Sequence, residues 1–295
     1  MYHLPPIYTR PPLRYSINSN NNHIAAPQLI TSDYYLSKSA QPSVHVPDPT
    51  HRQLVILDLN GTLVSRINNG MYVRPYQDLF LDYLFKWFDV MVWSSAQPHS
   101  VANMCRLFGS RQPVCIWDRR CFQLSGSQYN GKFPTIKNLE AVWWAFDQGK
   151  KYEAHNTILI DDSSHKSIMQ PYNAIHISTF HHRDSRLVNE GDKELIHVME
   201  YLEELRKQSN VSNYIRHHPY KSSSSPSTTT TTEHPHEHQV YFYDYTTGER
   251  ELVDLRSLVS IHKADPPPSS SSSPSSLPIA IETSSIETPS TMHTL

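Results

Sequence analysis

The chain has 295 residues, a formal net charge of −2 at pH 7 and three cysteines. This charge provides no overall basic field, so we do not expect direct nucleic-acid binding. Few cysteines, in an odd number, do not suit a disulfide framework and are typical of a reducing, intracellular compartment. No apolar stretch approaches the ~20 residues of a membrane span. We therefore expect a nuclear or cytoplasmic protein without a transmembrane helix.

The N-terminal residues 1–50 are rich in Pro, Asn, Ser and Tyr and show no sustained hydrophobic period, which predicts a disordered arm. Residues 1–32 lack acids, as transit peptides do, but Pro5, Pro6 and further prolines would interrupt the amphipathic helix that mitochondrial import needs. The segment "LPPIY" places Pro5, Pro6 and Tyr8 in a Pro-Pro-x-Tyr ligand of WW domains, which bind a preformed polyproline II turn. A chance match in Pro-rich sequence is the alternative.

The middle of the chain, residues 51–217, alternates apolar runs with helical periods, which is typical of βαβ units around a parallel sheet. The apolar runs predict strands at 54–57, 89–95, 114–117, 157–162 and 173–178. The helical periods predict helices within 74–88, 98–108 and 136–146, and after Asp192. In the first helix we expect one shared face of Leu79, Phe80, Tyr83 and Leu84.

The stretch "LVILDLNGTLV", residues 54–64, has two interpretations. Asn60-Gly61 between two apolar runs is a hairpin signal. The same letters also fit a buried strand that ends in an exposed carboxylate, Asp58. The continuous apolar run Leu54–Leu57 favours the second interpretation, because a strand of an exposed hairpin would alternate polar and apolar residues.

The C-terminal third is divided by composition. Residues 218–239 predict a low-complexity Ser/Thr/His linker, and residues 264–295 predict a disordered Ser/Pro-rich tail. Between them, residues 240–263 contain two short strand patterns around Thr247-Gly248, a possible hairpin. Because an isolated hairpin is marginally stable in water, we expect this one to dock elsewhere or to be mobile.

Polar groups collect where the predicted strands end. The carboxyl ends of three predicted strands carry Asp58, Ser94 and the pair Asp161-Asp162, and Lys137 opens the helix before the fourth strand. The carboxyl ends of parallel strands meet at one edge of a sheet, where ligands bind. A carboxylate can attack phosphorus, carboxylate oxygens suit Mg²⁺, and hydroxyl and ammonium groups hold the transferred oxygens. The pattern therefore predicts a phosphate and Mg²⁺ site.

Each of these residues also has a purely structural interpretation. Asp58 and Asp162 can be turn or capping acids, Ser94 can cap the following helix, and Lys137 can be a solvated helix residue.

Five segments in order resemble the haloacid-dehalogenase superfamily, and most closely its RNA polymerase II C-terminal-domain phosphatase or NLI-interacting-factor-like branch. These segments are "LDLNGTLV", "RPYQDLFLDYL", "VWSSA", "IKNLEAVW" and "ILIDDSSHKSIMQPYNAIHI". The resemblance implies a three-layer α/β fold with no large cap domain, and a phosphoprotein as substrate or partner.

The resemblance also implies a role for each residue. Asp58 is implied as nucleophile and Mg²⁺ ligand, Asp161 as a direct ligand and Asp162 as a ligand through water. The backbone carbonyl of Asn60 is implied as a further metal ligand. The phosphate-binding residues are implied to be Ser94, with Ser95 as an alternative, Lys137, and Thr62, which orients the loop.

Three features depart from that branch. The position that normally supplies the general acid is Asn60, and an amide cannot exchange that proton. The connection from Asp58 to Arg74 is short, and Asp118 stands where an Arg is expected. The leading interpretation is a weak Mg²⁺-dependent Ser/Thr phosphoprotein phosphatase that forms an aspartyl-phosphate. The alternative is a catalytically inactive domain that binds a partner, as a scaffold or a translocase receptor does.

Overall fold

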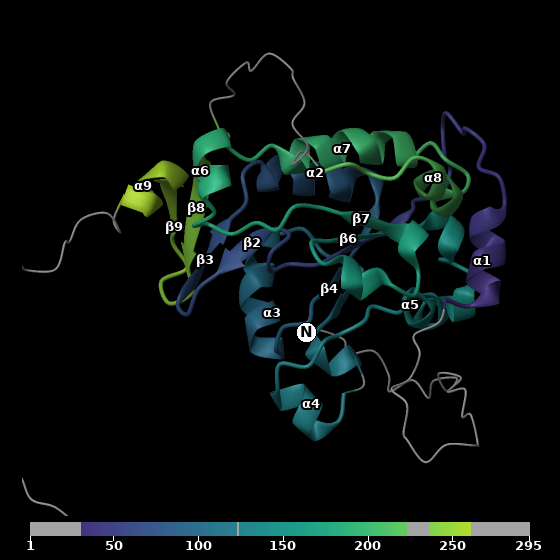
Figure 1. Ribbon diagram of the computed structural model, residues 1–295, viewed down its shortest axis with the longest axis horizontal. Helices are drawn as coiled ribbons and strands as arrows, with labels where there is room; N and C mark the ends of the chain where they lie inside the picture. The colour runs from purple at the N-terminus through teal and green to yellow at the C-terminus, as the bar shows by residue number, and fades with distance from the viewer. Residues whose placement is uncertain (1–30, 123, 223–235, 261–295) are drawn as a thin grey trace, which may run out of the picture.

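The computed structural model describes residues 31–122, 124–222 and 236–260. Its centre is a five-stranded parallel sheet with the strand order β5-β4-β1-β6-β7 (Figure 1). The strands are β1 (Leu54–Leu57), β4 (Asp89–Trp93), β5 (Cys115–Trp117), β6 (Thr157–Asp161) and β7 (Ala174–His176). The parallel α/β fold and all five predicted strands are confirmed.

Helices cover both faces of this sheet (Figure 1). The helices are α1 (Asp33–Ala40), α2 (Gln77–Trp87), α3 (Pro98–Met104), α4 (Gly126–Asn130), α5 (Leu139–Ala145), α6 (Ser185–Glu190), α7 (Glu194–Leu205), α8 (Val211–His217) and α9 (Leu255–Ser260). On β1, Val55 and Leu57 pack in the core beneath α2 and α7, whereas Leu54 and Ile56 pack in the core that holds α5. Burial on both faces explains why this strand is continuously apolar.

Helix α2 lies within its predicted range of 74–88 but differs from the prediction in its buried face. Tyr76 has a left-handed backbone conformation with φ 63°, so the helix begins at Gln77, after the Arg-Pro segment. The expected face included Leu79, but this side chain is 55% exposed, and the buried face contains Phe80, Leu81 and Leu84 instead. The prediction for Leu79 is therefore wrong.

A second, antiparallel sheet has the order β2-β3-β8-β9, made of β2 (Val64–Arg66), β3 (Gly70–Val73), β8 (Gln239–Asp244) and β9 (Arg250–Asp254). The hairpin predicted within 240–263 therefore exists, and it docks on β3. Gly70 allows the close approach, because a Cβ there would lie 2.6 Å from the ring of Phe242. The hairpin interpretation of Asn60-Gly61 is wrong, since β1 pairs only in parallel with β4 and β6.

The predicted boundaries of the two flanking segments also change. Residues 33–40, expected in a disordered arm, form α1, which Ser32 caps and Tyr35 anchors as a fully buried side chain. The Tyr35 hydroxyl accepts a hydrogen bond from the Tyr172 backbone at 2.8 Å. In the predicted linker, Glu237 is buried against Gly191. One aromatic anchor in a polar segment leaves no hydrophobic period, so local sequence does not reveal this docking.

The Pro-Pro-x-Tyr motif and the Ser/Pro-rich tail lie outside the described residues. Within the described part of the chain, no large cap domain interrupts the α/β core, and no helix is long and apolar enough to cross a membrane.

Candidate active site

Three carboxylates converge at the carboxyl edge of the parallel sheet. Asp58 directly follows β1, Asp161 ends β6, and Asp162 comes next in the chain. The two strands pair Leu57 with Ile160, which brings Asp58 and Asp161 level with each other. One oxygen from each of the three acids lies within 4.8 Å of the others. Asp58 and Asp161 are buried, so their negative charges need compensation.

Two ammonium groups compensate these charges. The Lys137 Nζ lies 2.9 Å from Asp58 Oδ1 and 2.5 Å from Asp161 Oδ2. The Lys166 Nζ lies 3.0 Å from Asp161 Oδ1 and 3.5 Å from Asp58 Oδ1. A backbone hydrogen bond of 2.8 Å from Lys137 N to Lys166 O holds the segments that carry these two lysines together. The structure thus brings together Asp58, Lys137, Asp161 and Asp162, which the sequence singled out, and adds Lys166.

The sequence analysis missed Lys166. It lies five positions after Asp161 on a short 3-10 turn, Ser164–Ser167, which folds the side chain back over the acid. A cation shortly after a strand-terminal acid pair was the signal that could have indicated it.

The acids and Lys166 have shifted proton affinities. Burial alone would raise the pKa of Asp161, but the charges of Lys137 and Lys166 outweigh it and lower the pKa. Burial and the nearby negative charge of Asp58 raise the pKa of Asp162. Burial opposes the charged form of Lys166, but Asp58 and Asp161 raise its pKa overall. Asp161 and Lys166 therefore favour each other's charged forms.

The donor set suits a magnesium ion. Its three acids offer only hard oxygen ligands, which Mg²⁺ prefers, and few protein ligands suffice because the ion keeps several waters. Gly61, with φ +90°, lets the loop pass directly against the Asp162 carboxylate, which a Cβ at this position would overlap. Both oxygens of Asp161 are engaged, Oδ1 by Lys166 and by Ser163 N and Oδ2 by Lys137. An ion that binds Asp161 therefore competes with these contacts for the carboxylate oxygens.

Ser94 lies at the same edge, after β4, which is the strand next to β1. Its side chain is buried, and its Oγ accepts a hydrogen bond from Ala96 N at 3.3 Å. This contact forms a local turn and does not cap α3, whose N-cap is Gln97, so the capping interpretation of Ser94 is wrong. The position suits phosphate binding. The alternative hydroxyl, Ser95 Oγ, is shared with Thr135 Oγ1 at 2.6 Å.

Thr62 is fully buried, and its Oγ1 has no hydrogen-bond partner among the described residues. Its carbonyl accepts a 3.1 Å hydrogen bond from Arg74. The Arg74 guanidinium also binds the Ser178 carbonyl and forms a buried ion pair with Asp192 at 2.9 Å. Arg74 therefore joins the loop after Asp58 to the segment after β7, where Phe180 N donates to Gly61 O at 2.7 Å.

Asn60 does not face the acids. Its side chain is exposed, and its Oδ1 accepts a hydrogen bond of 3.2 Å from the backbone N of Arg66, at the end of β2. The backbone of the same loop is fixed by the carbonyl of Leu59, which accepts from Leu63 N at 2.8 Å and Val64 N at 3.0 Å.

The arginines that follow Asp118 have structural roles. Arg119 is buried and donates to the carbonyls of Tyr129 at 2.7 Å and of Gln128 and Gly131 at 2.8 Å each. It thereby fixes the loop around α4. Arg120 pairs with Asp118 at 2.6 Å. Neither guanidinium has a hydrogen bond or ion pair with Asp58, Asp161 or Asp162.

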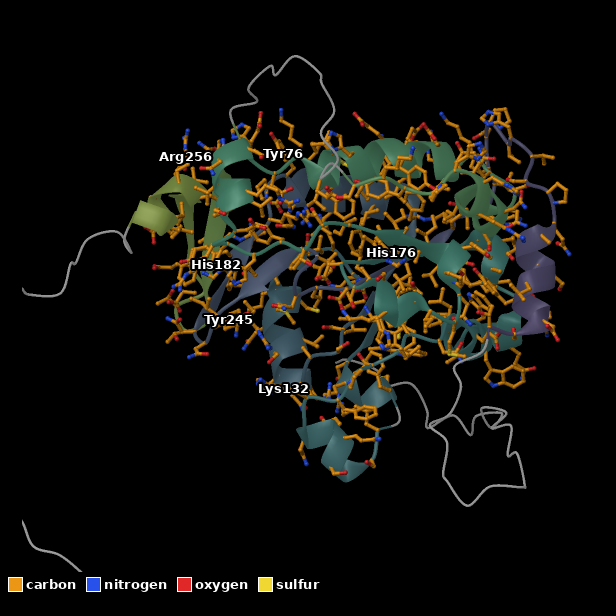
Figure 2. The ribbon with its side chains drawn as sticks, in the orientation of Figure 1. Tyr76, Lys132, His176, His182, Tyr245 and Arg256 are labelled. Carbon is orange, nitrogen blue, oxygen red and sulfur yellow. The ribbon has the colours of Figure 1, made fainter. Side chains whose placement is uncertain are left out.

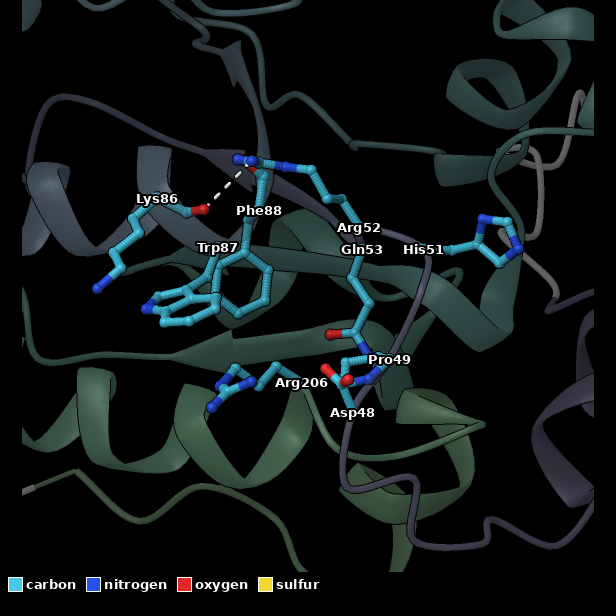
Figure 3. Close-up of a pocket in the computed structure, with 9 residues that line it drawn as sticks. All are labelled: Asp48, Pro49, His51, Arg52, Gln53, Lys86, Trp87, Phe88 and Arg206. Atoms are coloured by element: carbon cyan, nitrogen blue, oxygen red, sulfur yellow. Dashed lines mark hydrogen bonds between the residues drawn. The ribbon is translucent and has the colours of Figure 1, made fainter.

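A separate pocket of about 210 Å³ lies at the opposite edge of the sheet, before β1 and β4 (Figure 3). It is lined by Asp48, Pro49, His51, Arg52, Gln53, Lys86, Trp87, Phe88 and Arg206. Arg52 binds the carbonyls of Lys86 and Phe88, and Arg206 binds Glu203 and stacks on Trp87. Because these guanidinium groups are already engaged, the pocket offers no comparable reactive set.

The residues of the site lie within a segment that matches a known protein family. The pattern of the family described as NLI interacting factor-like phosphatase matches residues 53–212. An uncharacterized FCP1 homology domain-containing protein of Schizosaccharomyces pombe is 35% identical over 192 residues, which span 58% of this chain and 78% of that protein. The ubiquitin-like domain-containing CTD phosphatase 1 of Drosophila melanogaster is 24% identical, over 70% of this chain and 66% of its own length.

The corresponding protein of Xenopus tropicalis is 24% identical over 58% of this chain and 55% of its own length. The chain thus spans between about half and two thirds of these named phosphatases. Two solved structures of Fcp1, described as an RNA polymerase II CTD phosphatase, are 11% and 13% identical. Each has a TM-score of 0.34, and they cover 51% and 62% of this chain and 49% and 58% of their own chains. Because the family pattern covers more than half of the sequence, this chain belongs to the NLI interacting factor-like phosphatase family.

Proposed function

We propose that this protein is a Mg²⁺-dependent phosphatase of phosphoserine or phosphothreonine proteins, and that its turnover is weak. The observation that supports the proposal is the convergence of Asp58, Asp161 and Asp162 within 4.8 Å, beside the buried ammonium of Lys137. Acids, an ammonium and a nearby serine at the end of a parallel sheet suit phosphoryl transfer better than any other reaction of these groups.

In this proposal, an oxygen of Asp58 attacks phosphorus, and the bond from phosphorus to the serine or threonine oxygen breaks. The leaving alkoxide takes its proton from solvent water, and a further water then hydrolyses the aspartyl-phosphate, which releases inorganic phosphate and restores the Asp58 carboxylate. Lys137 holds the attacking carboxylate in place. Ser94 binds the oxygens of the phosphoryl group, and Thr62 orients the loop beneath that group. Asp58, Asp161, Asp162 and the Asn60 carbonyl would hold Mg²⁺, which supplies positive charge to the phosphoryl oxygens when bound.

The proposed substrate is a protein because no large cap covers the acids in the described part of the chain. The β2–β3 hairpin between Asp58 and Arg74 is short, and the C-terminal strands β8 and β9 extend it into a wider sheet beside the site. Named relatives are CTD phosphatases, so a phosphorylated, extended protein tail is the first substrate to test. A nuclear or cytoplasmic location agrees with such a substrate.

The orientation of Asn60 supports a second candidate function. The Asn60 amide, which binds the Arg66 backbone, cannot protonate a leaving group. The loss of general acid catalysis costs about 10²–10⁴-fold in rate. A domain that binds phosphoproteins without turning them over would retain the rest of the site. Such a domain would act as a scaffold or as a receptor in translocation.

Hydrolysis of 4-nitrophenyl phosphate and of a phosphoserine peptide, with and without Mg²⁺, tests the proposal. The Asp58→Asn variant is the blank. We expect slow Mg²⁺-dependent turnover of the aryl phosphate, whose leaving group needs little protonation, and slower turnover of the peptide. Equal rates for wild type and Asp58→Asn on both substrates would reject the phosphatase proposal, and phosphopeptide binding by the wild type would then favour the second candidate.

A further inference from the structure

Two ammonium groups share two buried carboxylates at the site, but their surroundings differ. The Lys137 side chain is fully buried, whereas the Lys166 side chain is 16% exposed. Asp58 Oδ1 contacts both ammonium groups, and the two oxygens of Asp161 are divided between them. Lys166 is the more exposed of the two ammonium groups and lies 3.5 Å from Asp58, so a phosphoryl group bound at Asp58 would lie near it.

A divalent ion that bridges Asp58 and Asp161 competes with the two ammonium groups for these carboxylates and is repelled by their positive charges. Lys137 has no exposed surface, and its removal would leave two buried carboxylates without their partner, which is costly. Lys166 extends from a short 3-10 turn and is partly exposed, so its side chain can move at a lower cost than that of Lys137. Lys166 is therefore the group that an arriving ion displaces.

Charge balance indicates where the displaced ammonium goes. Three carboxylates and two ammonium groups leave the site with one net negative charge, which repels a phosphoryl dianion. A divalent ion reverses the sign and frees the Lys166 ammonium at the entrance. An ammonium carries three hydrogen-bond donors and is attracted to phosphoryl oxygens.

We propose that Lys166 is a further phosphate-binding residue that occupies the acids in the metal-free site and donates to the phosphoryl group once a metal ion has replaced it there. This inference rests on the proposed function. It requires that removal of Lys166 change the affinities for metal and for phosphate in opposite directions, which loss of structure would not do.

Isothermal titration calorimetry of the full chain tests this requirement with Mg²⁺ alone and with inorganic phosphate at saturating Mg²⁺. In Lys166→Met we expect Mg²⁺ to bind roughly tenfold tighter or more, because the ion no longer has to replace a charged hydrogen bond of Lys166 to the acids. We expect phosphate to bind roughly tenfold weaker or more, because it loses a charged hydrogen bond from Lys166. Lys166→Arg keeps the charge and should stay within a few-fold of wild type. The matched control Lys151→Met removes an exposed lysine from an ion pair with Asp89 and should change neither affinity.

Thermal unfolding shows whether Lys166→Met folds, and Lys166→Gln is the replacement if it does not. Unchanged phosphate affinity in the folded variant, or weaker binding of both Mg²⁺ and phosphate, would overturn the role of Lys166. If the wild type binds neither Mg²⁺ nor phosphate, the proposed function itself fails, and the inference fails with it.

Discussion

Replacing Asn60 with aspartate should convert this protein into a faster phosphatase. The substitution restores a carboxyl two residues after Asp58 and is nearly isosteric, so the loop fixed by the Leu59 carbonyl should keep its shape. Positioned general acid–base catalysis contributes about 10²–10⁴-fold. The side chain must first leave the backbone N of Arg66, which it binds at 3.2 Å.

The cost of that movement reduces the gain. A hydrogen bond of this kind is worth about 1–2 kcal/mol, a factor of roughly 5 to 30 in rate. We therefore expect Asn60→Asp to raise kcat/KM on a phosphoserine peptide by roughly 3- to 2000-fold. The gain on 4-nitrophenyl phosphate should be smaller, because that leaving group departs without a proton.

The assay needs a control for the chemical change and a check of the sample. Asn68→Asp makes the same change at an exposed turn position and should leave both rates unaltered. Deamidation of Asn60 would produce the acid spontaneously, but it requires attack by the backbone N of Gly61, which is bonded to Val64 O at 2.8 Å. Mass spectrometry of the wild type should therefore show intact Asn60.

Two results would refute this reasoning. If pure Asn60→Asp binds Mg²⁺ normally but gains nothing on any phosphopeptide, the missing acid is not the only loss, and the binding function is favoured. If the wild type already turns over phosphopeptides as fast as Asn60→Asp, another group carries the proton.

Four further outcomes are expected. Lys137→Met should lower the free energy of unfolding by about 3 kcal/mol or more in urea titrations, because two buried aspartates lose a shared partner; a change below 1 kcal/mol would contradict the buried pair. Gly70→Val should destabilise the protein by about 1–3 kcal/mol by pushing β8 away from β3, whereas Gly126→Val, where space is open, should not cause this clash. His182 lies against the antiparallel sheet, with its ring stacked on Tyr72 (Figure 2). Burial, with the charge of the neighbouring His181, lowers the pKa of His182 to about 4. Because the unfolded chain binds this proton near pH 6.5, stability should fall by up to about 3 kcal/mol between pH 6.5 and 4, and less in His182→Gln. A peptide with "LPPIYTR" should bind a matching WW domain at micromolar affinity, and equal binding after Tyr8→Ala would show that the motif is incidental.

The sequence by itself determined the parallel sheet and the places of most site residues. Leu54–Leu57 is apolar without interruption because both faces of β1 are buried, and this local signal separated a buried strand from a hairpin. Asp58 directly follows one such strand and Asp161 ends another, so the rule that parallel strands end at one edge was enough to bring them together.

Tertiary structure alone decided the contacts between segments that are distant in the chain. Strand β8 pairs with β3, and Tyr35 fills a buried position beside Tyr172, although neither segment carries a local pattern that names its partner. The direction of the Asn60 side chain and the position of Lys166 over Asp161 are likewise set by neighbouring backbone and charge. Periodicity reports which face of an element is buried, whereas the choice of partner depends on the strand edges, cavities and uncompensated charges that remain once the core has formed.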